Sequence, residues 1–250
     1  MTVHAGLRSA WVLGRRVSRT AAIRLLIGIA AVAAASPASG EIGAVVSVFS
    51  DSRFRGISVS GGDPVATLDF SFDDPSGAYF AATGTAGFDS HELKPVSVEL
   101  NAGFAREIRP HLTFDVGLAH SSYERYPVTS QGSSYTEIYA GLTHKTLTAR
   151  VHLSPHYLET GRSTAYGELD HSLRLTRNFS LNSHVGLLLP VRTRAEDGIR
   201  SRVDWRIGLD RQIGRFALHA AFTGARGVRH YDSHGARTDS ALVIGASLIL

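Results

Sequence analysis

Apolar residues occupy every second position over most of the chain after residue 40. The pattern is clear in the last stretch, 241–250, where one face carries the apolar residues Leu242, Ile244, Ala246, Leu248 and Leu250 and the other face, with Val243, Gly245 and Ser247, is mostly small. Period-two alternation of this kind places one set of side chains on each face of a β-strand. About ten residues is also the length that a tilted strand needs to cross a bilayer. The stretch therefore predicts a transmembrane strand that closes a barrel.

The same unit repeats back to Glu41 and predicts an all-β, antiparallel transmembrane β-barrel of about twelve strands. The first strand is expected to continue past a β-bulge at Gly56, where the parity of the apolar positions reverses, to a hairpin turn at 61–63. The sequence leaves open which side chains of the predicted strand 79–87 point into the barrel, because its residues are small. Ten strands remain an alternative if this strand or the first two are miscounted. Short connections alternate with longer polar ones, which is typical of periplasmic turns and outer loops.

The first forty residues differ in kind from the rest. They hold five arginines and no Asp, Glu or Lys, and an uncharged run at 25–35 precedes Ser-Pro-Ala-Ser-Gly at 36–40. A basic region, a short apolar region and small residues are typical of a secretory signal peptide. We predict a signal peptide at 1–40, with cleavage after Gly40 or Ala38, and a barrel at 41–250. A signal anchor is the alternative, although the apolar run is too short to span a bilayer as a helix.

The charge of the chain changes when the signal peptide is removed. The full sequence has 26 basic and 22 acidic residues, and without the five arginines at the start 21 basic residues remain, a net charge of −1. No concentrated basic face is left for phosphates, which excludes a nucleic-acid partner. Cysteine is absent, so disulfides, thiolate metal sites and a cysteine nucleophile are excluded. Residues 41–250 contain no run of 18 apolar residues, so a closed barrel is the remaining way to span a membrane.

Charged residues on the inward face are the candidate functional residues. Both signs occur on strands whose other face is apolar, and an Arg or Lys facing lipid at the midplane costs roughly 2–4 kcal/mol. The predicted pore-lining residues are Asp51, Arg53, Arg55, Asp69, Glu99, Asp115, Glu137, Arg150, Glu168, Asp170, Arg174, Asp204 and Arg206. They predict a narrow water-filled pore, and their mixed signs argue against strong ion selectivity. A lumen plugged by its own salt bridges is the alternative.

Two stretches near the start resemble a known family. Residues 50–58 read Ser-Asp-Ser-Arg-Phe-Arg-Gly-Ile-Ser, Gly62-Asp63-Pro64 follows, and 76–81 read Ser-Gly-Ala-Tyr-Phe-Ala. They are similar to the opening of the TorF-type porins of proteobacteria. The resemblance implies a pore in the outer membrane of a Gram-negative bacterium. The expected partners are outer-membrane lipid, small hydrophilic solutes and the barrel assembly machinery, with no cofactor, no metal and no enzymatic activity.

Other classes of function have weaker signals. His120 and Ser122 share the outward face of one strand, where an imidazole could activate a hydroxyl toward lipid, as in outer-membrane lipid hydrolases. The same spacing recurs on the inward face at His152 and Ser154, so the motif is not specific. A structural or adhesive barrel with its function in the loops is a further alternative.

A metal site is also considered. His230, Asp232 and His234 alternate in the last long loop, with a spacing suited to one cation. Since the sequence shows no third and fourth ligand near them, a solvated loop is the simpler interpretation.

Overall fold

The computed structural model describes residues 40–89, 92–124, 132–159, 162–191, 201–229 and 236–250. These residues form β-strands and a short 3₁₀ helix, η1. The elements are β1 (Glu41–Phe49), β2 (Arg53–Phe54), β3 (Ile57–Ser58), β4 (Val65–Asp73), β5 (Ala78–Asp89), β6 (Glu92–Arg109), β7 (Leu112–Tyr123), β8 (Ser133–His144), β9 (Leu147–Ser154), η1 (Tyr157–Glu159), β10 (Thr164–Arg174), β11 (Phe179–Pro190), β12 (Arg202–Ile213), β13 (Phe216–Arg229) and β14 (Ala236–Ile249).

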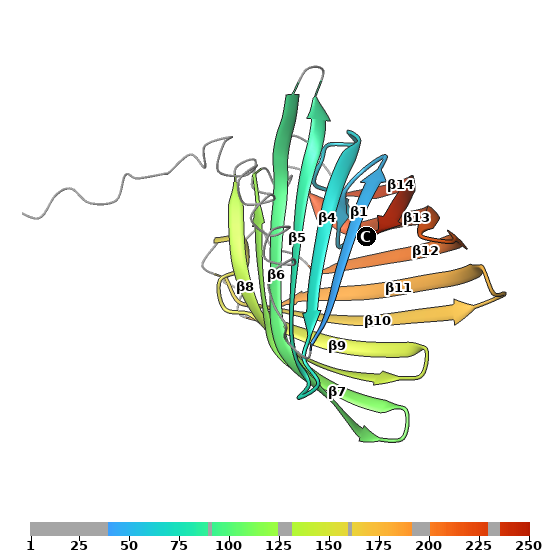
Figure 1. Ribbon diagram of the computed structural model, residues 1–250. Coiled ribbons are helices and arrows are strands. Elements are labelled where there is room, and N and C mark those ends of the chain that lie inside the picture. The colour runs from blue at the N-terminus through green and yellow to red at the C-terminus, as the bar shows by residue number, and fades with distance from the viewer. Residues whose placement is uncertain (1–39, 90–91, 125–131, 160–161, 192–200, 230–235) are drawn as a thin grey trace, which may run out of the picture. The chain divides into compact units, whose positions relative to one another are not determined.

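Twelve of the strands, β1 and β4 to β14, form one closed antiparallel barrel (Figure 1). Strands that follow one another in this series pair, and β1 closes the ring by pairing with both β4 and β14. In the closing pair, Val45 lies opposite Ile249 and Phe49 lies opposite Gly245. Each strand of the ring therefore has two neighbours, and the ring has no open edge. The predicted twelve-stranded all-β barrel is confirmed, and the ten-strand alternative is wrong.

The two faces of the barrel wall differ in chemistry. Large apolar side chains cover the outer face, where Ile207 is 59% exposed and Val151 is 53% exposed. The inner face carries polar, charged and small residues together with several tyrosines. In β5, whose facing the sequence left open, Phe80 points outward, whereas the Tyr79 hydroxyl contacts residues of β7 and β8 inside the ring. No helix among the described residues is long and apolar enough to cross a membrane.

The connections at the two ends of the barrel differ in length. At the end where β1 begins and β14 finishes, the turns after β6, β8 and β12 have two residues each. Those after β4 and β10 have four residues each. Hydrogen bonds from the side chain and backbone of Ser76 hold the pKa of Asp74 below its usual value in the turn after β4. Connections at the opposite end are longer, except that between β5 and β6. The predicted alternation of short and long connections is present.

The segment between β1 and β4 differs from the prediction. We expected the first strand to continue past a β-bulge at Gly56, but β1 ends at Phe49, and β2 pairs with β3 in a small separate hairpin. Arg55 and Gly56 have φ angles of 46° and 74°. Two successive left-handed residues are the signature of a type I′ turn, which reverses the chain. The prediction was wrong because a change of parity at a glycine fits a reversal as well as a bulge. We call residues 50–64 the inner hairpin.

The predicted signal peptide lies outside the described residues, apart from Gly40. The prediction of its cleavage site therefore stays a prediction.

The apolar outer face predicts how the barrel responds to charge. We expect Val151→Arg on the outside of β9 to lower the free energy of unfolding in lipid vesicles by about 2–4 kcal/mol, because a guanidinium would have to lie in hydrocarbon. Thr148→Arg is the matched control, since Thr148 is on the inner face of the same strand and lines a polar recess. Denaturant titration of both variants in vesicles measures the difference. Equal losses for the two would contradict the assignment of the faces.

Candidate functional site

The base of the inner hairpin is organised around one carboxylate. The Ser58 and Ser60 hydroxyls donate to Asp51 Oδ1 at 2.6 and 2.8 Å, and Arg53 Nη1 donates to Asp51 Oδ2 at 2.9 Å. Arg53 also lies 2.9 Å from Asp239 on β14. These bonds satisfy a carboxylate that is only 8% exposed, so they fix the two arms of the hairpin to each other and to the closing strand.

The tip of the inner hairpin reaches the far wall of the barrel. Arg55 Nη2 lies 2.6 Å from Glu137 Oε2 on β8, and its guanidinium lies 3.8 Å from the centre of the Tyr166 ring on β10. In the ring of twelve strands, β10 is opposite β4, from which the hairpin enters. Arg55 therefore crosses the interior, and its side chain is 5% exposed. The charge is stabilised there by an ion pair and by the aromatic face.

Gly56 holds the tip close to β13. A β-carbon at this position would lie 2.3 Å from the carbonyl oxygen of Gly224, so only glycine fits this contact without a shift of the backbone. The next residue, Ile57, is fully buried and forms a small cluster with Ala225. The inner hairpin thus contacts β13 and β14 on one side and β8 and β10 on the other.

Apolar and aromatic side chains pack around the inner hairpin inside the barrel. Phe54 packs against this core, and a second segment, the connection that holds η1, contributes Tyr157 and Leu158. The buried members are Val59, Tyr123, Tyr135, Tyr157, Leu158, Tyr166 and Leu188. We call this set the lumen core. Packed aromatic rings exclude water, so the half of the lumen with the longer connections is narrowed by protein rather than filled by solvent.

Three tyrosines lie flat on the inner wall because each has a glycine beside it. A β-carbon at Gly186 would come within 2.0 Å of the Tyr166 hydroxyl, and Gly103 and Gly117 face Tyr79 and Tyr139 in the same way. Lying along the wall brings these hydroxyls to charged groups. The Tyr79 hydroxyl donates to Asp115 Oδ1 at 2.5 Å and also bonds to the Tyr139 hydroxyl.

Three carboxylates, an arginine and a histidine form the next part of the interior. His152 lies between Glu137 and Glu168, at 3.3 and 3.1 Å. Arg150 contacts Asp115 at 2.6 Å and Glu168 at 3.7 Å. Since Glu137 also receives Arg55, these contacts link the hairpin tip to β7, β8, β9 and β10 through one continuous network.

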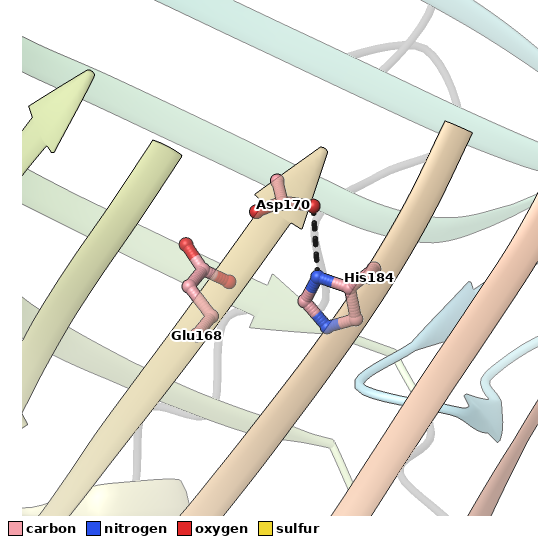
Figure 2. Close-up of side chains that lie close together, drawn as sticks. All are labelled: Glu168, Asp170 and His184. Carbon is pink, nitrogen blue, oxygen red and sulfur yellow. Dashed lines mark hydrogen bonds and ion pairs between the residues drawn. The ribbon is translucent and has the colours of Figure 1, made fainter. Parts of the chain in front are cut away.

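His184 is held between two further carboxylates. Its Nδ1 lies 2.9 Å from Asp170 Oδ1 and its Nε2 lies 2.9 Å from Asp204 Oδ1. The Tyr166 hydroxyl also donates to Asp204, at 3.1 Å. Figure 2 shows His184 on β11 facing Asp170, with Glu168 beside them on β10.

Glu168, Asp170 and His184 are near enough to one another to suit a metal ion, with ligand atoms within 4.8 Å of each other. Both ring nitrogens of His184 already contact carboxylates, and Glu168 already contacts Arg150 and His152. A metal would have to displace these partners, so we assign the three residues to the ion-pair network. The other set considered, His230, Asp232 and His234, lies outside the described residues.

The structure places most of the predicted pore-lining residues inside the barrel. Asp51, Arg53 and Arg55 belong to the inner hairpin rather than to a wall strand. Arg174 differs from the rest because it ends β10 and is exposed at the rim. The remaining residues lie on the inner face of the wall: Asp69, Glu99, Asp115, Glu137, Arg150, Glu168, Asp170, Asp204 and Arg206.

Several residues of the network were not among the predicted sites. His152, His184 and Tyr139 have inward parity, but only residues with a permanent charge were selected. Tyr166 and Arg202 were not singled out, and Asp239 lies outside the predicted closing strand. An inward tyrosine opposite an inward glycine on the neighbouring strand is the signal that could have found Tyr79 and Tyr139, and for Tyr166 the glycine, Gly186, lies diagonally across.

His120 and Ser122, the residues considered for a lipid hydrolase, are exposed on the outer face of β7. His120 Nδ1 lies 3.0 Å from the Thr136 hydroxyl on β8. The imidazole is therefore hydrogen-bonded to a threonine and not to the serine that it would have to activate.

The sequence of residues 32–243 matches the model of one protein family, which is described as a bacterial protein of unknown function, Gcw_chp. The chain belongs to this family. No curated protein sequence matches the chain. The family's description does not carry the TorF name, so that resemblance stays a prediction.

Solved porins have a similar fold. The NanC porin aligns with a TM-score of 0.58 at 11% identity, over 83% of this chain and 100% of that chain. The KdgM porin aligns with a TM-score of 0.51 at 8% identity, over 83% of this chain and 98% of that chain. At these identities the similarity concerns the fold, and this member of the Gcw_chp family has a porin-like barrel.

The buried pair of Arg55 and Glu137 predicts how the inner hairpin can be released. In Glu137→Gln, Arg55 loses its counter-charge, and breaking such a buried pair costs about 3–5 kcal/mol. We expect the hairpin to open more often and trypsin to cleave after Arg55 about 100-fold faster or more.

The cleavage is followed by mass spectrometry of the folded protein in detergent. Glu107→Gln, which changes an exposed carboxylate near the end of β6, is the control and should keep the rate of the unmodified protein. If Glu137→Gln were as resistant as the control, the ion pair would not be what holds the hairpin inside.

Proposed function

We propose that the protein is a pore for passive diffusion of small hydrophilic solutes, with its narrowest point at the inner hairpin. The observation that carries this proposal is the contrast between the two faces of the wall. The outer face is apolar, whereas charged groups from the wall strands and from the hairpin line the inside. Charged side chains inside a closed barrel are stabilised by water or by ion pairs, and a lumen lined by such groups suits the passage of hydrophilic solutes.

An outer-membrane location in a Gram-negative bacterium belongs to the same proposal. The exposed apolar band fits outer-membrane lipid, and the porin-like fold and the predicted signal peptide support export followed by insertion through the barrel assembly machinery. Short turns at the end where β1 begins and β14 finishes suggest that this end faces the periplasm. The inner hairpin would then lie toward the outside of the cell.

The two halves of the lumen have different roles in this proposal. The half near the short turns keeps a polar recess of about 130 Å³, whose lining includes Thr148, Asp170, Asn182 and Arg206. The other half holds the inner hairpin and the lumen core. A solute entering from the recess would therefore meet its main barrier at Arg55 and the groups around it.

A structural barrel with a plugged lumen is the second candidate. It is favoured by the lumen core, in which Tyr123, Tyr157 and Tyr166 are each 1% exposed. Such packing resembles a protein interior more than the lining of a wide channel. The two candidates differ in one measurable property, which is conduction by the folded protein.

Single-channel recording distinguishes the two candidates. We expect the protein, purified in detergent and added to a planar lipid bilayer, to give small discrete current steps. Arg55→Ser should enlarge the steps by about twofold or more, because the shorter side chain no longer crosses the lumen. Arg174→Ser at the rim is the control and should leave the step size nearly unchanged. A folded, heat-modifiable protein that gives no steps would support the plugged barrel.

A further inference from the structure

Carboxylates outnumber guanidinium groups inside the barrel. The described interior contains ten carboxylates and five arginines, from the wall strands and the inner hairpin together. The carboxylates are Asp51, Asp69, Glu99, Asp115, Glu137, Glu168, Asp170, Asp204, Asp210 and Asp239, and the arginines are Arg53, Arg55, Arg150, Arg202 and Arg206. The difference is five negative charges with neutral histidines. Two negative charges remain even if His152, His184 and His219 are all protonated.

This excess belongs to the interior rather than to the whole chain. Residues 41–250 together carry 21 basic and 22 acidic residues, a net charge of −1. The rest of that region is therefore net positive, and the acidic groups are concentrated in the lumen. A low-dielectric wall focuses the field of charges that it encloses, so an interior charge acts on a passing ion more strongly than a charge at the rim.

Some of the carboxylates have only neutral or titratable partners. Asp69 accepts a hydrogen bond from the Thr83 hydroxyl at 2.7 Å. Asp210 is bonded to the Asn182 amide and lies 2.8 Å from His219 Nδ1. Neither contacts an arginine among the described residues, so their charges are not cancelled by a guanidinium.

Asp204 is a third carboxylate whose partners are neutral or titratable. Its side chain is 1% exposed, it contacts His184 and Tyr166, and its Oδ2 has no hydrogen-bond partner among the described residues.

We infer that the pore prefers cations, and that small cationic or neutral hydrophilic solutes, rather than anions, are its substrate class. This inference rests on the proposed function. Asp69 and Asp210 are the selectivity-determining residues that we assign, because each adds a negative charge to the inner wall that no arginine neutralises. The preference for cations is moderate, because carboxylates on the wall and on the hairpin hold the arginines of the network, and their positive charge, inside the same lumen.

The experiment measures the reversal potential of single channels in a KCl gradient. We expect a potassium-to-chloride permeability ratio above about 3 for the unmodified protein, and a ratio about twofold lower in Asp69→Asn and in Asp210→Asn. Asparagine keeps the size and the hydrogen-bonding capacity of each side chain. Glu124→Gln is the control, because Glu124 is exposed directly after β7, outside the inner hairpin, and its loss should leave the ratio unchanged.

The outcomes separate this inference from the proposed function. Discrete steps with a ratio of one or less would overturn the cation preference and leave the pore intact. A cation-selective pore whose ratio is unchanged in both variants would overturn the assignment to Asp69 and Asp210. A folded protein that gives no steps at all would overturn the pore and the inference together.

Discussion

The pairing of β1 with β14 is the contact on which the rest of the structure depends. In an open sheet, both edge strands would present unpaired backbone groups, and the sheet would have no inside. Once the ring is closed, period-two alternation sends every second side chain into a confined space and the others to the outer surface. The inner hairpin depends on that closure most directly, because it contacts β13 and β14 on one side and β8 and β10 on the other.

Alternation alone predicted the wall correctly but not what fills it. The count of twelve strands and the faces of most strands follow from parity, since a strand with one apolar and one polar face has a single sensible orientation in a closed ring. The inner hairpin was missed because Phe54 continues the alternation of the first strand, and Ile57 and Val59 resume it with reversed parity, which also suits a wall strand with a bulge. Its turn depends on left-handed backbone at Arg55, an arginine, which no local sequence rule favours.

The candidate site was predictable as a set of residues and not as an arrangement. Parity placed Glu137, Glu168 and Asp204 inside, but which carboxylate pairs with which cation depends on the register between strands and on contacts across the ring. The partnership of Arg55 with Glu137 joins residues 82 positions apart. The histidines were passed over because an imidazole has no fixed charge, although His152 and His184 each join two carboxylates that would otherwise repel one another.

The inner hairpin also affects how easily the cross-section of the barrel can be deformed. A ring of strands resists extension along its hydrogen bonds, but its cross-section is easily flattened because adjacent strands can rotate about one another. Arg53 and Gly56 fasten the hairpin to β14 and β13, and Arg55 fastens it to β8 and β10. The hairpin therefore braces the ring across its diameter and opposes its lateral compression at the end with the long connections.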